Sequence, residues 1–290
     1  MYNGEFQVDL EAYFRIIRPS ICFFEAIIAI IGQILAKGVF PESTIALKAF
    51  ISIFLITASG NVLNDYLDYE VDSVNTPWRP IPSGKVSRAS ALQYGILLGI
   101  LGIAVTLLVN LAAATLGLVI FMLTNLYSVK GKIYGIVGNT IIAFTISSCF
   151  LFGVLTVTTN IKPYNVFIFG LCFLYVLGGE VIQSIADAEG DKVRGVKSIA
   201  IVCGHRTAAV VASICYALMA IGGTYTAFQF SLGIDFTYTI IIIVFTVLII
   251  GVITVPLLRR PDKETARRTR SIVNVIAFLL ILGFIVILLI

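Results

Sequence analysis

Residues 46–84 read ALKAFISIFLITASGNVLNDYLDYEVDSVNTPWRPIPSG. The first half of this stretch is an apolar run of about the 20 residues that a helix needs to cross a bilayer. The second half gathers three aspartates and a glutamate between residues 65 and 72. The stretch therefore predicts a membrane-spanning helix that leads directly into an acidic motif at the membrane surface.

The whole chain has the composition of a membrane protein. Of its 290 residues, 59% are hydrophobic and only 12% are charged, and the mean hydropathy is +1.02. Soluble domains are less apolar and carry about twice that share of charge. The net charge of +4 does not indicate a nucleic-acid partner, because the basic residues punctuate apolar runs and form no solvated patch.

A single all-α domain over residues 1–290 is predicted, a polytopic bundle of nine transmembrane helices around a central cleft. The division between the third and fourth spans depends on Asn110, which supplies the turn between two Leu/Ala-rich stretches. On the same length criterion, the nine spans cover residues 20–37, 46–64, 91–109, 111–128, 135–156, 164–185, 208–230, 237–257 and 271–290.

The distribution of basic residues supports this count. With nine spans, one side of the membrane receives most of the 20 Lys and Arg residues, and the other side keeps only Lys37, Lys48 and Lys162. Cytoplasmic loops carry the excess of Lys and Arg. We therefore expect a multi-pass protein of the cell membrane with a cytoplasmic N-terminus, cytoplasmic acidic loops and an external C-terminus.

The first acidic motif has the spacing of a metal site. Asn64, Asp68 and Asp72 recur at i, i+4 and i+8, which puts them on one helical face, and Asp65 flanks the same stripe. Oxygen ligands without His or Cys suit Mg²⁺, which takes one or two carboxylates together with phosphate oxygens. A solvated helix end is the other interpretation of one such motif alone.

A second acidic cluster repeats this spacing in residues 187–204, DAEGDKVRGVKSIAIVCG. Asp187 and Asp191 stand four residues apart, and both clusters follow an even number of crossings, so they share one side of the membrane. Facing each other, the two motifs predict one catalytic and metal-binding set: Asn64, Asp68, Asp72, Asp187 and Asp191.

Basic residues lie close to both clusters and are candidates to bind phosphate oxygens. Glu25 and Glu180 lie within or at the edge of spans, where either a bonded partner inside the bundle or a role in the site accounts for an acid. His205 is expected at the surface. The phosphate-binding candidates are Arg18, Arg79, Lys130, Lys132, Lys192 and Arg194.

The chain resembles the UbiA-type superfamily of intramembrane prenyltransferases. The matching elements are NDxxDxxxD from Asn64 to Asp72, RPxxSG from Arg79 to Gly84, a YSxxK-like element at residues 127–130, and DxEGD from Asp187 to Asp191. Together with these elements, the residues near the two clusters give an expected substrate-binding set of Arg18, Asp65, Arg79, Tyr127, Lys130, Glu180, Lys192 and Arg194.

The resemblance also implies a reaction. A prenyl diphosphate bound through Mg²⁺ loses its diphosphate, and a lipid-soluble acceptor captures the allylic cation, with no protein partner. Residues 60–84 are most similar to the archaeal branch that transfers a geranylgeranyl group to geranylgeranylglyceryl phosphate in membrane lipid synthesis. An aromatic, haem or chlorin acceptor is an alternative, and an ion-coupled transporter is a rival from another class.

One stretch departs from that branch. Its enzymes carry an RExxKD-like element shortly before the second motif, and this chain reads Gly179, Glu180, Val181, Ile182, Gln183 and Ser184 there. An arginine, a lysine and an aspartate are therefore missing near the predicted site.

Overall fold

The structure is a computed structural model that describes residues 9–129, 131–193, 195–229, 247 and 250–289. The described part is helical and contains no strand. Its helices are α1 (Leu10–Ile16), α2 (Pro19–Lys37), α3 (Ser43–Leu67), α4 (Tyr69–Asn75), α5 (Arg88–Leu107), α6 (Leu111–Val129), the 3₁₀ helix η1 (Gly131–Tyr134), α7 (Ile136–Val157), α8 (Pro163–Ala186), α9 (Ala188–Val193), α10 (Ile199–Val202), α11 (His205–Gln229), the π-helix η2 (Ile250–Thr254), α13 (Val255–Arg259) and α14 (Lys263–Leu289).

Seven helices of the described part are long and apolar enough to cross a membrane, namely α2, α3, α5, α6, α7, α8 and α11. They match the first seven predicted spans to within a few residues at each end. Asn110 does separate the third and fourth spans, because its side chain accepts a hydrogen bond from the Ala113 amide at 2.8 Å at the start of α6.

The last two predicted spans are only partly described. Most of the predicted span 237–257 lies outside the described residues, and its described end forms η2 and part of α13. The predicted span 271–290 corresponds to α14 as far as Leu289, where the described residues end, and α14 begins at Lys263, eight residues earlier than the predicted boundary. Asp262 accounts for this start, because its carboxylate accepts a hydrogen bond from the Thr265 amide at 2.8 Å.

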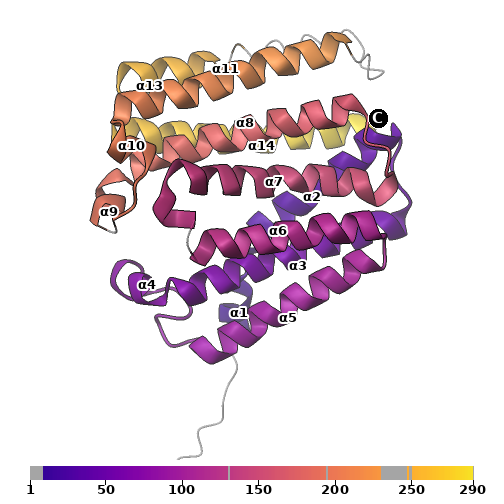
Figure 1. The fold of residues 1–290 in the computed structure, drawn as a ribbon, viewed down its shortest axis with the longest axis horizontal. Helices are drawn as coiled ribbons and strands as arrows, with labels where there is room; N and C mark the ends of the chain where they lie inside the picture. Colours follow the sequence, from indigo (N-terminus) through magenta and orange to yellow (C-terminus); the bar gives the residue numbers. More distant parts are fainter. Residues whose placement is uncertain (1–8, 130, 194, 230–246, 248–249, 290) are drawn as a thin grey trace, which may run out of the picture.

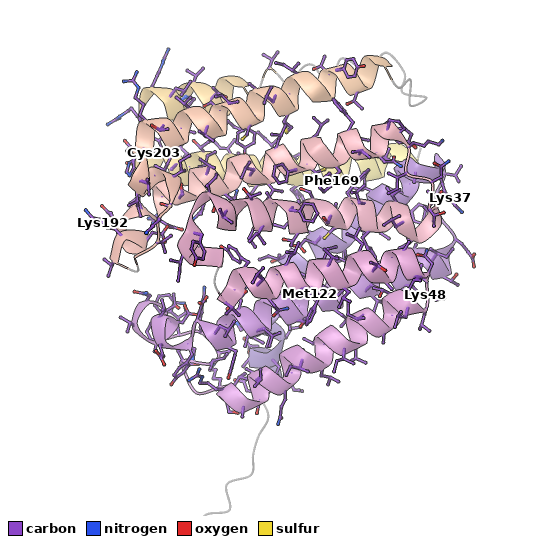
Figure 2. All side chains as sticks on the ribbon, viewed as in Figure 1. Lys37, Lys48, Met122, Phe169, Lys192 and Cys203 are labelled. Atoms are coloured by element: carbon purple, nitrogen blue, oxygen red, sulfur yellow. The ribbon has the colours of Figure 1, made fainter. Side chains whose placement is uncertain are left out.

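The long helices run side by side along one direction (Figure 1). The short helices α4, α9 and α10 gather at one end of the bundle, and the C-terminus lies at the other. Lys37 and Lys48 lie at the end opposite to Lys192 and Cys203 (Figure 2). Both acidic motifs therefore lie at the same end of the bundle, as the predicted crossings require.

Small residues let the central helices approach closely. A Cβ atom at Gly153 of α7 would lie 1.8 Å from the backbone oxygen of Ala29 in α2, and one at Gly32 would lie 2.2 Å from that of Phe150. Such backbone contact is typical of helix pairs in membranes. Large apolar side chains instead cover outward faces, for example Leu97, Ile100 and Leu101 of α5, as a lipid-facing surface requires.

Candidate active site

The first acidic motif lies at the joint between two helices. The sequence predicted one continuous helical face, but α3 ends at Leu67 and α4 begins at Tyr69, with Asp68 between them at φ −82° and ψ 4°. The Asp68 amide still bonds to the Asn64 oxygen at 2.9 Å, and the Asp72 amide to the Asp68 oxygen at 2.8 Å. The four-residue spacing therefore survives the joint.

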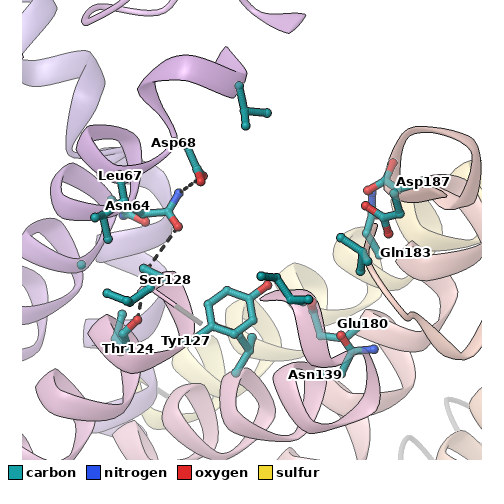
Figure 3. Close-up of a pocket in the computed structure, with 18 of the residues that line it drawn as sticks. Asn64, Leu67, Asp68, Thr124, Tyr127, Ser128, Asn139, Glu180, Gln183 and Asp187 are labelled. Carbon is teal, nitrogen blue, oxygen red and sulfur yellow. Dashed lines mark hydrogen bonds between the residues drawn. The ribbon is translucent and has the colours of Figure 1, made fainter. Parts of the chain in front are cut away.

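Hydrogen bonds position the Asn64 side chain. Its amide group donates to a carboxylate oxygen of Asp68 at 3.1 Å, and its own oxygen accepts from the Ser128 hydroxyl at 3.2 Å (Figure 3). Ser128 belongs to α6 and is four residues from Thr124, whose backbone oxygen it also contacts at 3.1 Å. The YSxxK-like element at the end of α6 thus supports the first motif.

Asp65 ties two arginines to the first motif. It is 4% exposed, and its carboxylate lies 2.5 Å from Arg18 Nη2 and 3.4 Å from Arg79 Nη1. Arg79 also reaches Asp72 at 2.5 Å. The arginines line the cavity described below and Asp65 does not, so this aspartate contacts the basic residues and is set back from the space that a substrate would occupy.

Local backbone geometry brings both arginines to Asp65. Arg18 has φ 52°, the one positive φ at a non-glycine residue in the described part, just before Pro19 opens α2. Residues 79–84 form a turn in which the Ser83 amide bonds to the Arg79 oxygen at 2.9 Å, and Gly84 takes φ 76°. The RPxxSG element thus folds Arg79 back onto the first motif.

The second motif repeats the construction of the first. Asp187 stands between α8 and α9, and its amide bonds to the Gln183 oxygen at 3.0 Å, while the Asp191 amide bonds to the Asp187 oxygen at 2.9 Å. The Gln183 side chain donates to the Asp187 carboxylate at 2.7 Å. Gln183, Asp187 and Asp191 therefore correspond to Asn64, Asp68 and Asp72, an amide followed by two carboxylates at four-residue steps.

Gln183 was missing from the predicted site. The signal that would have found it is the spacing, because Gln183 precedes Asp187 by the interval that separates Asn64 from Asp68. Thr76, Asn139 and Ser198 also line the cavity without having been predicted. Thr76 donates a hydrogen bond to the Asp72 carboxylate at 3.0 Å.

A cavity of about 870 Å³ separates the two motifs. Figure 3 shows Asn64 and Asp68 on one side of the open space, and Glu180, Gln183 and Asp187 on the other. The predicted residues that line this cavity are Arg18, Asn64, Asp68, Asp72, Arg79, Tyr127, Glu180, Asp187 and Asp191.

Four of the predicted basic residues are not placed at the cavity. Lys192 is exposed on α9 and is not among the lining residues. Its position follows from the helix, since it directly follows Asp191, whose side chain faces the cavity. Lys130 and Arg194 lie outside the described residues, as does the side chain of Lys132.

An ion pair joins α9 to α14 outside the cavity. Lys263 at the start of α14 donates a hydrogen bond to the Glu189 carboxylate. This hydrogen bond, with the positive charge of Lys263, lowers the pKa of Glu189 below its ordinary value. Glu189 is fully exposed, so the pair contributes little to stability and belongs to the surface rather than to the site.

The donor atoms of the cavity suit a hard cation. Amide and carboxylate oxygens line both walls, and no histidine or cysteine is among the described residues of the lining. Within the described ranges, no three His, Cys, Asp or Glu side chains stand close enough to form a complete metal site. Mg²⁺ does not require one, because it is commonly held by one or two carboxylates with phosphate oxygens and water completing its shell.

The comparison with known families decides the assignment of this fold. Residues 26–282 match the UbiA prenyltransferase family. The chain belongs to the UbiA prenyltransferase family. The resemblance inferred from the two acidic motifs is therefore confirmed, and so is prenyl transfer as the activity of the family.

Curated UbiA relatives match over almost their whole length. The digeranylgeranylglyceryl phosphate synthase of Methanocaldococcus jannaschii is 32% identical, with 98% of each chain covered. The synthase of the same name from Thermococcus kodakarensis is 31% identical, with 96% of this chain and 98% of the relative covered.

Solved structures share the fold. A structure of digeranylgeranylglyceryl phosphate synthase superposes with a TM-score of 0.80 at 32% identity, covering 96% of this chain and 97% of that one. A UbiA homolog from Archaeoglobus fulgidus, solved with GPP and Mg²⁺ bound, superposes with a TM-score of 0.75 at 18% identity, covering 96% and 100%. At 18% identity, the likeness to the Archaeoglobus fulgidus protein shows a shared fold.

Proposed function

We propose that this protein transfers a geranylgeranyl group from its diphosphate to geranylgeranylglyceryl phosphate, with Mg²⁺ as cofactor, in the synthesis of archaeal membrane lipids. The observation that carries the proposal is the pair of matching acidic motifs that face each other across one cavity. The full-length likeness to synthases that make digeranylgeranylglyceryl phosphate supports the acceptor.

The proposed ligands of Mg²⁺ are Asn64, Asp68, Asp72, Asp187 and Asp191. When bound, the metal supplies positive charge next to the leaving diphosphate. The protein contributes further charge through Arg18 and Arg79, whose guanidinium groups line the same cavity. Positive groups that are fixed before the reaction stabilise the negative charge that grows on the diphosphate as its bond to carbon breaks.

Asp65 and Ser128 support these groups from behind. Asp65 holds Arg18 and Arg79 at the edge of the cavity, so neither arginine has to be ordered when the substrate arrives. Ser128 orients Asn64. Leu67, Tyr127 and Ile142 add apolar surface to the cavity, against which a prenyl chain can pack.

The arrangement in the membrane is part of the proposal. Nine spans put the N-terminus and both acidic motifs on the cytoplasmic side and the C-terminus outside. The grouping of α4, α9 and α10 at one end of the bundle, with Lys37 and Lys48 at the other, supports this orientation. A diphosphate donor would then enter its site from the cytoplasm while its prenyl chain stays in lipid.

The test of the acceptor uses purified protein in detergent with labelled geranylgeranyl diphosphate and a panel of acceptors. We expect product with geranylgeranylglyceryl phosphate in the presence of Mg²⁺, and none after chelation. Product with 4-hydroxybenzoate or a naphthoate alone would instead assign the chain to the aromatic acceptors. The same panel includes haem and chlorin acceptors, and product with one of these alone would assign the chain to the tetrapyrrole acceptors.

The test of the two motifs is a double substitution. Asp68→Ala with Asp191→Ala removes one carboxylate from each wall, and we expect activity to fall by at least about a thousandfold, since both walls stabilise the leaving group. Glu70→Ala with Glu189→Ala is the matched control, because it removes two exposed acids from the same segments. Equal activity in the two double variants would contradict the mechanism.

A further inference from the structure

One arginine of α14 reaches the wall of the cavity from outside. Arg270 donates a hydrogen bond from Nη2 to Glu180 Oε1 of α8 at 3.1 Å, and the two side chains are 26% and 19% exposed. Arg267 and Arg268 of the same helix are exposed. Arg270 instead turns toward α8 and enters the bundle.

Gly179 makes room for this guanidinium. A Cβ atom at residue 179 would lie 1.8 Å from Arg270 Nη1 and 3.4 Å from the Tyr216 hydroxyl. Any side chain other than hydrogen would therefore occupy the place of the guanidinium. A Cβ atom at residue 178 would likewise lie 2.9 Å from the ring of Tyr216. The two glycines form a groove in α8 that admits one side chain from α14 and one from α11.

Glu180 is the end point of this contact and lines the cavity. It differs from the other acids of the lining, because Asp68 and Asp187 stand at helix ends and Glu180 lies within the spanning helix α8. Seven residues separate it from Asp187, which places it about 10 Å further along the helix axis. Its carboxylate thus lies deeper in the bundle than the motifs, on the side toward which the prenyl chain of a bound donor would extend.

We propose that Glu180 takes the proton of the acceptor hydroxyl, and that Arg270 is the positioning residue that holds the Glu180 carboxylate at the cavity wall. This inference rests on the proposed function, in which a hydroxyl is the nucleophile. The acceptor oxygen forms a bond to the first carbon of the prenyl chain, and the carbon–oxygen bond to the diphosphate breaks, with the electron pair leaving on the diphosphate. The hydroxyl proton passes to Glu180 and from there to solvent.

A carboxylate is a sufficient base for this step. A neutral hydroxyl that adds to an allylic cation becomes an oxonium ion, which is a far stronger acid than a carboxylic acid, so the proton moves downhill. The requirement is position, because a base must stand within hydrogen-bond reach of the proton it removes. Arg270 meets that requirement by fixing one carboxylate oxygen, which leaves Glu180 Oε2 for the acceptor.

The first experiment measures transfer to geranylgeranylglyceryl phosphate by Glu180→Gln. The amide keeps the shape and can still accept a hydrogen bond from Arg270, so the fold is retained, but it is no base. We expect kcat to fall about a hundredfold or more, in the range that general base catalysis contributes, with KM for the donor within twofold of the wild type. A kcat within twofold of the wild type would overturn the proposal.

The second experiment moves the arginine without touching the cavity. Gly179→Ala displaces only the flexible end of Arg270, and Arg270→Gln removes its charge. We expect each to lower kcat by about tenfold through misplacement of the carboxylate, and Arg270→Lys to recover part of the loss. Gly170→Ala on the same helix is the matched control, because a Cβ atom there meets nothing within 4 Å.

The outcomes separate the two levels of the proposal. If the wild type makes no product from geranylgeranylglyceryl phosphate, the proposed function falls and the inference falls with it. If the wild type makes product and Gly179→Ala behaves as Gly170→Ala does, only the role of Arg270 falls. If Glu180→Gln raises the donor KM as much as it lowers kcat, Glu180 holds the donor, and its role as a base is overturned.

Discussion

Asp65 and Asp68 are three residues apart and do different work. Asp68 lines the cavity and accepts a hydrogen bond from Asn64, whereas Asp65 is buried between Arg18 and Arg79. The sequence alone did not separate their roles, because both carry a carboxylate on adjoining faces of one helix. The structure separates them by burial and by the charge that each one meets.

This difference predicts unlike responses to the same substitution. Asp65→Asn keeps the shape but removes the anion that Arg18 contacts and leaves Arg79 paired with Asp72. We therefore expect a loss of about 1–3 kcal/mol in stability, below the cost of a fully buried pair because both arginines reach solvent. Thermal unfolding in detergent measures it. Glu11→Asn, which breaks an exposed pair with Arg15, is the control, and an equal shift in both variants would contradict the assignment.

The spacing of the acidic residues was readable from sequence, while their partners were not. Two aspartates four residues apart predict a shared helical face wherever the helix lies. Arg79 contacts Asp72, seven residues earlier, only because a turn folds the chain back on itself. Arg270 contacts Glu180, 90 residues earlier, only because α14 packs against α8. Partners of this kind follow from the tertiary fold.

At the scale of the element, α2 and α7 meet through their backbones at Gly153 and Gly32. Gly153→Ala would bring its Cβ atom to 1.8 Å from the Ala29 oxygen, which no side-chain rotation can relieve. We expect the helices to separate and stability to fall by about 1–3 kcal/mol, the cost of overpacking. Thermal unfolding in detergent measures the change.

Gly223→Ala is the matched control for that prediction. Gly223 also lies in a spanning helix, α11, but a Cβ atom there meets nothing within 4 Å. A helical alanine is intrinsically favoured over glycine, so this variant should match or exceed the wild type. If Gly153→Ala unfolded at the same temperature as Gly223→Ala, the close contact between Gly153 and the Ala29 backbone would not contribute to stability.

The limits of the long helices were predictable because apolar length is a direct signal of a span. The short helices α4 and α9 were not predicted, since they are polar and lie beyond the apolar runs. For the same reason the break at Asp68 was missed: the spacing of Asn64, Asp68 and Asp72 fits both a continuous helix and two helices joined at the middle residue.

At the scale of the whole molecule, the two halves of the site share one plan. A spanning helix ends at an aspartate, and a short helix follows with a second aspartate four residues later, in α3–α4 and again in α8–α9. Each first aspartate accepts a hydrogen bond from an amide side chain one turn earlier. Opposed copies of one motif suit a diphosphate, whose two phosphate groups present similar oxygens to both walls.

The orientation of the bundle in the membrane can be tested with its own cysteines. Cys203 is exposed between α10 and α11 at the end that holds both motifs, while Cys22, Cys149 and Cys215 are buried. Cys172 lies within the spanning helix α8. A maleimide that cannot cross the bilayer should therefore label Cys203 alone, and only from the side of the membrane that faces the active site.

We expect this label in sealed inside-out vesicles and not in right-side-out vesicles, because the loops rich in Lys and Arg are cytoplasmic. Cys203→Ser should abolish it. Lys37→Cys, introduced into Cys203→Ser, places a thiol at the opposite end of the bundle and should reverse the pattern. Labelling of Cys203 in right-side-out vesicles would put both motifs outside the cell, where no cytoplasmic supply of prenyl diphosphate reaches them.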